Sequence, residues 1–142
     1  MFHPARTARV AVVVSAANYD ACLDFYRQYA VLQILWQDVD RGIAVFGGQL
    51  GERSLTLLRE RDGKAPGLHH VGLEVSDAED LANSIVVARR SGIETFAETR
   101  QNGRHSICIR DPDGTALQFY AGADLPFDVL SGAGDDELPY LV

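Results

Sequence analysis

Two stretches of this chain decide its fold: Gly67-Leu68-His69-His70-Val71-Gly72-Leu73-Glu74-Val75-Ser76-Asp77 and Arg110-Asp111-Pro112-Asp113-Gly114-Thr115-Ala116-Leu117-Gln118-Phe119-Tyr120. The first alternates large apolar side chains with polar or small ones, as a strand with one buried face does, and its last residue can cap a helix. The second contains a tight reversal in which Pro presets φ and Gly supplies a positive φ. Together they predict the opening strand and the closing hairpin of one structural unit.

The second half of the chain forms this unit. Its predicted elements are a strand at residues 69–75, a helix after Asp77, and strands near 93–98, 105–110 and 115–121. The helix carries Leu81, Ile85 and Ala88 on one stripe and ends at Ser91-Gly92. The predicted order is therefore βαβββ.

The first half repeats this order. A strand, a helix and three strands are predicted at residues 9–14, 19–31, 33–37, 42–47 and 54–59. Val14-Ser15 and Val75-Ser76 precede the two helices, which supports an internal repeat of about 60 residues. The sequence thus predicts a single α+β domain of two βαβββ modules, residues 8–61 and 67–121, followed by an acidic tail at 122–142.

Composition disfavours several classes of function. The chain has 142 residues, of which 46% are hydrophobic, enough for a core without metal or disulfides. Its net charge is -7 and its basic residues are scattered, which argues against nucleic-acid binding. Cys22 and Cys108 lack metal-ligand spacing and are expected as reduced thiols. Because no leader-like start or bilayer-long apolar run is present, we expect a cytoplasmic protein that does not enter a membrane.

The acidic tail, residues 122–142, allows two interpretations. Its carboxylates meet no basic residue, as in a solvated tail. Its apolar residues, however, are too numerous for a disordered segment and favour a tail that lies across the domain or a partner subunit. These apolar residues are Leu125, Phe127, Leu130, Leu138, Tyr140 and Leu141.

The two opening motifs also carry a resemblance. In their order and separation, together with Leu23-Asp24-Phe25-Tyr26, they make residues 8–121 similar to the vicinal oxygen chelate superfamily, the glyoxalase, bleomycin-resistance and extradiol-dioxygenase group. The resemblance implies two βαβββ modules whose curled mixed sheets enclose a cavity. It also implies a homodimer and a small-molecule ligand.

Strand alternation indicates which residues face that cavity, because successive side chains point to opposite faces of a sheet. If the large apolar side chains pack against the helices, the opposite face carries a polar set. This set is Arg9, His70, Glu74, Gln118 and Tyr120.

The resemblance implies metal ligands on the first and fourth strands of each module, typically two His or Gln and two Glu. In this chain these positions fall on Arg9, on Thr56 or Leu58, on His70 and on Gln118. His70 is a good ligand and Gln118 a weak one, whereas a guanidinium cannot ligate a cation. We therefore expect no metal cofactor. The alternative is a rearranged site for Fe, Mn, Zn or Ni on His70 and Gln118, with further ligands from His3, His69, Glu74 or His105.

The expected function is binding of a small aromatic or anionic molecule in the cavity. Arg9 would bind an anionic oxygen, and His70 could act as an acid or base. Gln118 and Tyr120 would orient the ligand by hydrogen bonds, and Trp36 would be either core or an aromatic wall of the site.

Each role also has a structural alternative. Arg9 and Glu74 could form an ion pair between the modules, and His70 could be a hydrogen-bonded wall residue. Arg104, His105 and Arg110 border the hairpin and are expected as exposed charge. For the whole protein, the alternatives are an enzyme of the dioxygenase, lyase or isomerase type, and a structural dimer with a vestigial cavity.

Overall fold

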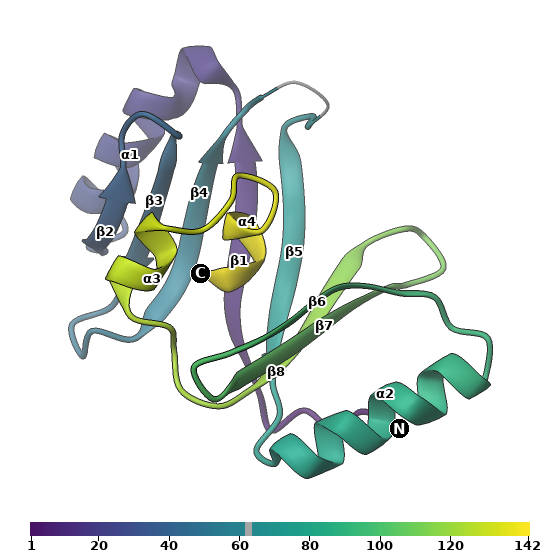
Figure 1. Ribbon diagram of the computed structural model, residues 1–142. Coiled ribbons are helices and arrows are strands. Elements are labelled where there is room, and N and C mark those ends of the chain that lie inside the picture. The colour runs from purple at the N-terminus through teal and green to yellow at the C-terminus, as the bar shows by residue number, and fades with distance from the viewer. Residues whose placement is uncertain (62–63) are drawn as a thin grey trace.

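The computed structural model describes residues 1–61 and 64–142, and the backbone alone at residues 6–8. Eight strands form one continuous sheet in the order β2-β3-β4-β1-β5-β8-β7-β6 (Figure 1). The strands are β1 (Arg6–Val14), β2 (Gln33–Asp38), β3 (Ile43–Gly47), β4 (Arg53–Arg59), β5 (Gly67–Glu74), β6 (Thr95–Gln101), β7 (Arg104–Arg110) and β8 (Ala116–Ala121). The helices are η1 (Ala16–Asn18, a 3-10 turn), α1 (Tyr19–Gln28), α2 (Ala78–Arg90), α3 (Phe127–Ser131) and α4 (Leu138–Leu141).

Each half of the chain contributes four neighbouring strands, and the halves join through β1 and β5. β1 runs antiparallel to β5 and parallel to β4, while β5 runs parallel to β8. The first and fourth strands of each module therefore lie at the centre of the sheet. This confirms the predicted α+β fold of two βαβββ units, joined as one curled, unclosed mixed sheet.

The predicted signals of α2 are confirmed. Asp77 caps the helix, because its carboxylate accepts a hydrogen bond of 2.9 Å from the backbone amide of Glu79. Leu81, Ile85 and Ala88 are buried beneath the helix, as the apolar stripe predicts.

The Asp-Pro-Asp-Gly reversal between β7 and β8 is also confirmed. Gly114 has φ 93°, and its amide donates to the backbone oxygen of Asp111 at 2.9 Å. The Asp111 carboxylate accepts from the amides of Asp113 and Thr115, both at 2.9 Å. These bonds fix the register of β7 against β8, and so the position of Gln118 and Tyr120.

α1 is shorter than predicted. It ends at Gln28, and Val31 has φ 55°, a left-handed conformation that no helix can include. Its apolar side chains, among them Leu23 and Tyr26, belong to one cluster with Phe46 of β3 and Leu57 of β4. This contact defines the outer face of the first half.

The tail lies across the opposite face, which we call the inner face. Figure 1 shows α3 and α4 in front of β3, β4 and β1. The buried tail residues form one cluster with residues of these strands, and this supports the interpretation in which the tail covers the domain. The cluster contains Leu125, Leu130, Leu138, Leu141 and Val142 of the tail, and Ala11, Val13, Ile43, Val45 and Leu58 of the sheet.

The two cysteines, Cys22 and Cys108, are free thiols, as predicted. Within the described ranges, no helix combines the length and the apolar character needed to cross a membrane.

Candidate ligand-binding site

Strand register brings the predicted polar residues together on the inner face. In the ladder β1-β5-β8, Arg9 pairs with Gly72, and Gly72 pairs with Gln118. Along β5, alternation places His70 and Glu74 on the same face as Gly72. The strands thus align the five predicted residues, Arg9, His70, Glu74, Gln118 and Tyr120, although their binding role stays a prediction.

The stem of Arg9 lies over Gly72. A Cβ added to Gly72 would come within 2.7 Å of Arg9 Cγ, so this position has room only for glycine. The Arg9 guanidinium lies 4.7 Å from the centroid of the Tyr120 ring. Its Nη2 donates to Asp124 Oδ1 at 2.6 Å. Arg9 therefore forms an ion pair with a carboxylate from the segment after β8. The sequence pattern suggested Glu74 as the partner of Arg9.

Two further arginines, Arg53 and Arg104, lie beside Arg9, and sequence reasoning missed both as site residues. Arg53 donates from Nη2 to the backbone oxygen of Leu125, and its Nε lies 3.8 Å from Asp124 Oδ2. Arg104 is 2% exposed, and its guanidinium lies 4.8 Å from the centroid of the Tyr120 ring. The Tyr120 ring thus contacts two guanidinium groups.

The prediction of exposed charge beside the hairpin is wrong for Arg104 and His105. β7 begins at Arg104, whose side chain points to the inner face and is covered there by the tail. His105 is buried, and its Nε2 lies 2.8 Å from Glu98 Oε2. Arg110 is exposed, as predicted. Strand alternation, extended by one residue to the start of β7, is the signal that finds Arg104.

Three guanidinium groups share the carboxylate of Asp124. Burial alone would raise the pKa of Asp124, but Arg9, Arg53 and Arg104 lower it below its ordinary value. Burial, followed by repulsion from Arg9, lowers the pKa of Arg104 to about 10. Burial likewise lowers the pKa of Arg53, although Asp124 opposes the shift. The local charge is therefore positive and only partly balanced.

Several donors in this cluster have no acceptor. Within the part of the chain that the structure describes, five guanidine nitrogens are buried without a hydrogen-bond partner, which is costly in a protein interior. They are Nε and Nη1 of Arg9, Nη1 of Arg53, and Nε and Nη2 of Arg104.

His70 and its neighbour His69 form a neutral pair. Their Nδ1 atoms are 2.8 Å apart, so one ring donates to the other. Burial, followed by the nearby charge of His69, lowers the pKa of His70 to about 3. Burial also lowers the pKa of His69 to about 4. At neutral pH neither ring is charged, so His70 is a weak proton acceptor and not an imidazolium acid.

Tyr140, on α4, covers His70 and Gln118. The ring centroids of Tyr140 and His70 are 5.5 Å apart, with planes 26° from parallel. The backbone oxygen of Tyr140 accepts from Gln118 Nε2 at 2.6 Å and from Arg104 Nη1 at 3.5 Å. Gln118 Oε1 and the Tyr120 hydroxyl are buried without a partner among the described residues. The tail thus occupies the predicted cavity.

The remaining predicted positions lie in the first half. Trp36 is half-buried, and its ring stacks on Phe127 of α3 at a centroid distance of 6.2 Å and an interplanar angle of 1°. Thr56 and Leu58 are buried on β4. Leu58 contacts the tail cluster, so this part of the inner face is filled by apolar side chains.

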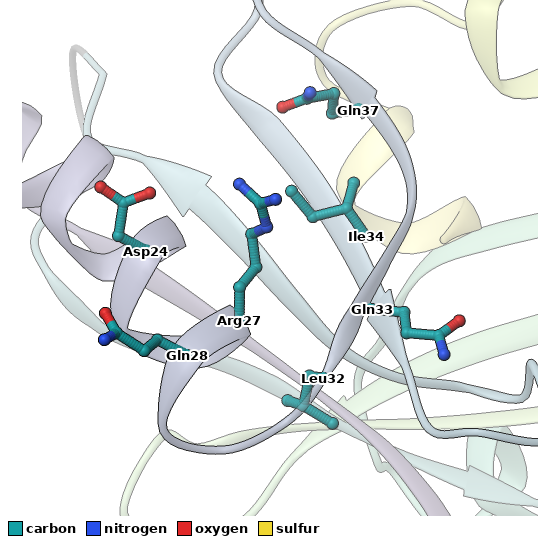
Figure 2. Close-up of a pocket in the computed structure, with 7 residues that line it drawn as sticks. All are labelled: Asp24, Arg27, Gln28, Leu32, Gln33, Ile34 and Gln37. Atoms are coloured by element: carbon teal, nitrogen blue, oxygen red, sulfur yellow. The ribbon is translucent and has the colours of Figure 1, made fainter.

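A large surface hollow lies away from the arginine cluster. Its volume is about 880 Å³, and it lies between α1 and β2 (Figure 2). Figure 2 shows Arg27 extending from α1 toward Ile34 of β2. The hollow is open and mostly polar, and its lining contains none of the predicted site residues. The buried arginine cluster is therefore the better candidate for a binding site.

Metal-ligating side chains are dispersed. Among residues 1–61 and 64–142, no group of three His, Cys, Asp or Glu side chains lies close enough to hold a metal ion. Two of the candidates for a rearranged site have other partners, since His3 contacts Asp80 at 3.3 Å and His105 contacts Glu98.

Solved structures of known proteins share this fold. A variant of Streptomyces coelicolor methylmalonyl-CoA epimerase in complex with 2-nitronate-propionyl-CoA is 19% identical, with a TM-score of 0.58 over 85% of this chain and 99% of that chain. The 2,3-dioxygenase LapB from Pseudomonas sp. KL28 is 19% identical, with a TM-score of 0.65 over 85% of this chain and 42% of that chain. A variant of homoprotocatechuate 2,3-dioxygenase from Brevibacterium fuscum is 18% identical, with a TM-score of 0.66 over 84% of this chain and 33% of that chain.

The dioxygenases are thus much longer than this chain, and at such identities the likeness concerns the fold alone. No curated protein sequence matches the chain. A family profile, described as the Glyoxalase/Bleomycin resistance protein/Dioxygenase superfamily, matches residues 8–119. Because this match covers most of the chain and agrees with the fold, the protein belongs to the Glyoxalase/Bleomycin resistance protein/Dioxygenase superfamily.

Proposed function

We propose that the protein binds a small organic anion on the inner face, where its two halves meet, through Arg9, Arg53 and Arg104, and without a divalent metal. The observation that carries this proposal is the imbalance of charge, because three buried guanidinium groups share the carboxylate of Asp124. Buried charges need partners, and guanidinium groups bind carboxylates and phosphates with well-directed pairs of hydrogen bonds. The five unpartnered nitrogens are the donors for such an anion.

The residues at the superfamily's usual ligand positions do not suit a metal ion. Arg9 places a cation at the first position, and the second offers Thr56 or Leu58, which are poor donors. At the third, the Nδ1 of His70 is hydrogen-bonded to His69, and at the fourth the amide nitrogen of Gln118 donates to Tyr140. Three guanidinium groups would also repel a divalent cation. We therefore propose that the arginines, and not a metal ion, bind the negative charge of the ligand.

An enzyme that uses His70 as its acid or base is the second candidate. The unpartnered Tyr120 hydroxyl and Gln118 Oε1, on the same face of the sheet as His70, favour a site in which a bound molecule is oriented. A pKa of about 3 makes His70 a weak base at neutral pH, however, far from the range that suits general catalysis. Binding is therefore the better-supported function.

Calorimetric titration with inorganic phosphate and with benzoate tests the proposal. The wild-type protein should bind at least one of these anions, and Arg104→Met and Arg9→Met should each weaken binding by about tenfold or more. Arg90→Ala is the matched control, because Arg90 is an exposed arginine on α2. If the two methionine variants bind the anions as tightly as the wild type, the proposal is overturned. It is also overturned if the wild type binds neither anion.

Metal analysis of protein purified without a histidine tag tests the metal-free part. We expect well below one metal ion per chain. About one Fe, Mn, Zn or Ni per chain, retained through gel filtration, would contradict it and restore the rearranged site on His70 and Gln118.

The homodimer and the cytoplasmic location stay predictions. Phe25, Tyr29 and Val31 are large apolar side chains exposed at the end of α1, and they offer a surface for a second copy. Light scattering coupled to gel filtration should give twice the chain mass, and Tyr29→Asp should shift it toward the monomer if this surface is used.

A further inference from the structure

The C-terminal segment, residues 122–142, supplies ligand-like groups to the proposed site. Asp124 places a carboxylate on Arg9 at 2.6 Å and near Arg53 at 3.8 Å. Tyr140 places an aromatic ring on the histidine pair and a carbonyl oxygen on Gln118 and Arg104. Of these residues, Arg9, His70 and Gln118 are ones that strand alternation assigns to the cavity.

The contacts of Tyr140 describe a binding subsite. Its ring lies 5.1 Å from the His69 ring, 5.5 Å from the His70 ring and 6.2 Å from the Phe96 ring, measured between centroids. Beside this aromatic wall, Gln118 Nε2 and Arg104 Nη1 both donate to one oxygen atom. Gln118 is fully buried, and Arg104 Nε and Nη2 remain without partners among the described residues. The subsite therefore has more donors than one carbonyl oxygen can use, as expected for a site shaped to a carboxylate.

The two ends of the segment are held differently. Arg41 ties down α3, because its guanidinium donates to the backbone oxygens of Ala133 at 2.7 Å and Leu130 at 3.1 Å while it pairs with Asp38. Residues 134–137, which follow, are exposed. α4 is only four residues long, and a helix of this length depends on its tertiary contacts for stability. α4 also packs Leu138, Leu141 and Val142 into the tail cluster, so its docked position is strongly favoured. Displacement of α4 exposes these side chains, while Arg41 keeps α3 docked.

We propose that α4 is an internal competitor for the site, and that the ligand it stands in for is an aromatic carboxylate. This inference rests on the proposed function. The ligand's ring takes the place of the Tyr140 ring on His69, His70 and Phe96. Its carboxylate takes the place of the Tyr140 carbonyl, with bonds to Gln118 and Arg104. Arg9 and Arg53 keep Asp124 and add their remaining positive charge to the attraction of the carboxylate.

Competition by a tethered segment has a measurable consequence. A site that is open for only a fraction of the time binds with an affinity reduced by that fraction, and a nearby tether makes the fraction small. Removing the Tyr140 ring should raise the open fraction. Tyr140→Ala should therefore bind benzoate about tenfold more tightly than the wild type does. Acetate has no ring, so both proteins should bind acetate at least tenfold more weakly than benzoate.

The control variant is Val39→Ala, which shortens an exposed apolar side chain between β2 and β3. Its benzoate affinity should equal that of the wild type. The fluorescence of Trp36, the single tryptophan, reports whether α3 stays packed in Tyr140→Ala, because its ring stacks on Phe127. An unchanged emission maximum shows that the variant keeps its fold.

Hydrogen exchange on the wild type gives a second test that does not depend on a variant. Saturating benzoate should speed amide exchange in residues 138–142 by about tenfold and leave residues 127–131 unchanged. If benzoate binds with dependence on Arg104 but α4 stays protected and Tyr140→Ala binds no more tightly, the competitor role is overturned and the proposed function stands. Acetate affinity equal to benzoate affinity would overturn the aromatic class. If the wild type binds none of the anions, both proposals fall.

Discussion

The two halves of the sheet have the same architecture, but their inner faces differ. In the first half, Val13, Val45 and Leu58 carry apolar side chains that the tail buries. In the second half the same face is polar: His70 and Gln118 lie there, and the hydroxyls of Thr99 and Ser106 are 2.6 Å apart. In a duplicated fold, the inner face of one half can therefore be buried core while the same face of the other half keeps polar side chains that can bind a ligand. Arg9 and Arg53 lie in the first half but direct their guanidinium groups toward the boundary.

The largest expected effect tests whether the first half is truly core. Leu58 is 4% exposed and contacts the tail cluster, so Leu58→Ala should lower the free energy of unfolding by about 2–5 kcal/mol. Urea denaturation measures this change. Leu50→Ala, at a leucine that is 94% exposed, should leave the unfolding midpoint unchanged. A loss below about 1 kcal/mol for Leu58→Ala would mean that the tail packs loosely on this face.

The next effect tests the polar character of the second half through pH. The pKa of His70 lies at about 3, below its ordinary value of 6.5, so the folded state resists protonation. Its contribution to stability is full above about pH 6.5 and is lost as the pH falls toward 3. Between pH 7 and pH 5 this amounts to about 2 kcal/mol.

His70→Gln should therefore flatten the dependence of unfolding free energy on pH between 7 and 5, as measured by urea denaturation at each pH. His3→Gln is the control, because His3 is an exposed histidine near the start of the chain. Equal slopes in the wild type and His70→Gln would show that His70 is solvated, and the contrast between the two inner faces would then weaken.

The smallest effect separates binding from stability. Arg104 is buried with two unpartnered nitrogens, and a methionine of similar length avoids the cost of burying this charge. Arg104→Met should leave the free energy of unfolding unchanged or raise it by about 1 kcal/mol, although it should lose anion binding. A loss above about 2 kcal/mol in urea denaturation would instead make Arg104 a structural residue.

Most of the sheet could be predicted from sequence because its signals are local. Alternation along β1, β5 and β8 placed Arg9, His70 and Gln118 on one face, and the Asp-Pro-Asp-Gly turn fixed the register of the last hairpin. The cap at Asp77 and the stripe of α2 were equally local.

The partners of these residues could not be predicted in the same way. Asp124 and Tyr140 reach the site through contacts that span 115 and 22 residues of sequence, and no local pattern encodes such distances. Arg53 lies next to a register shift between β3 and β4, which breaks the alternation that would have assigned its side chain to a face. The apolar residues of the tail predicted that the tail is buried, but they did not predict which face of the sheet it covers.

The bare backbone at Gly72 makes positions 9 and 72 a matched pair for protein engineering. The Arg9 stem fills the space that a side chain at residue 72 would need. A histidine at position 9, as a first step toward a metal centre, would keep a Cγ where Arg9 has one, so residue 72 would still have to be glycine. Conversion of this site into a metal centre can therefore change residue 9 but must leave its neighbour on β5 unchanged.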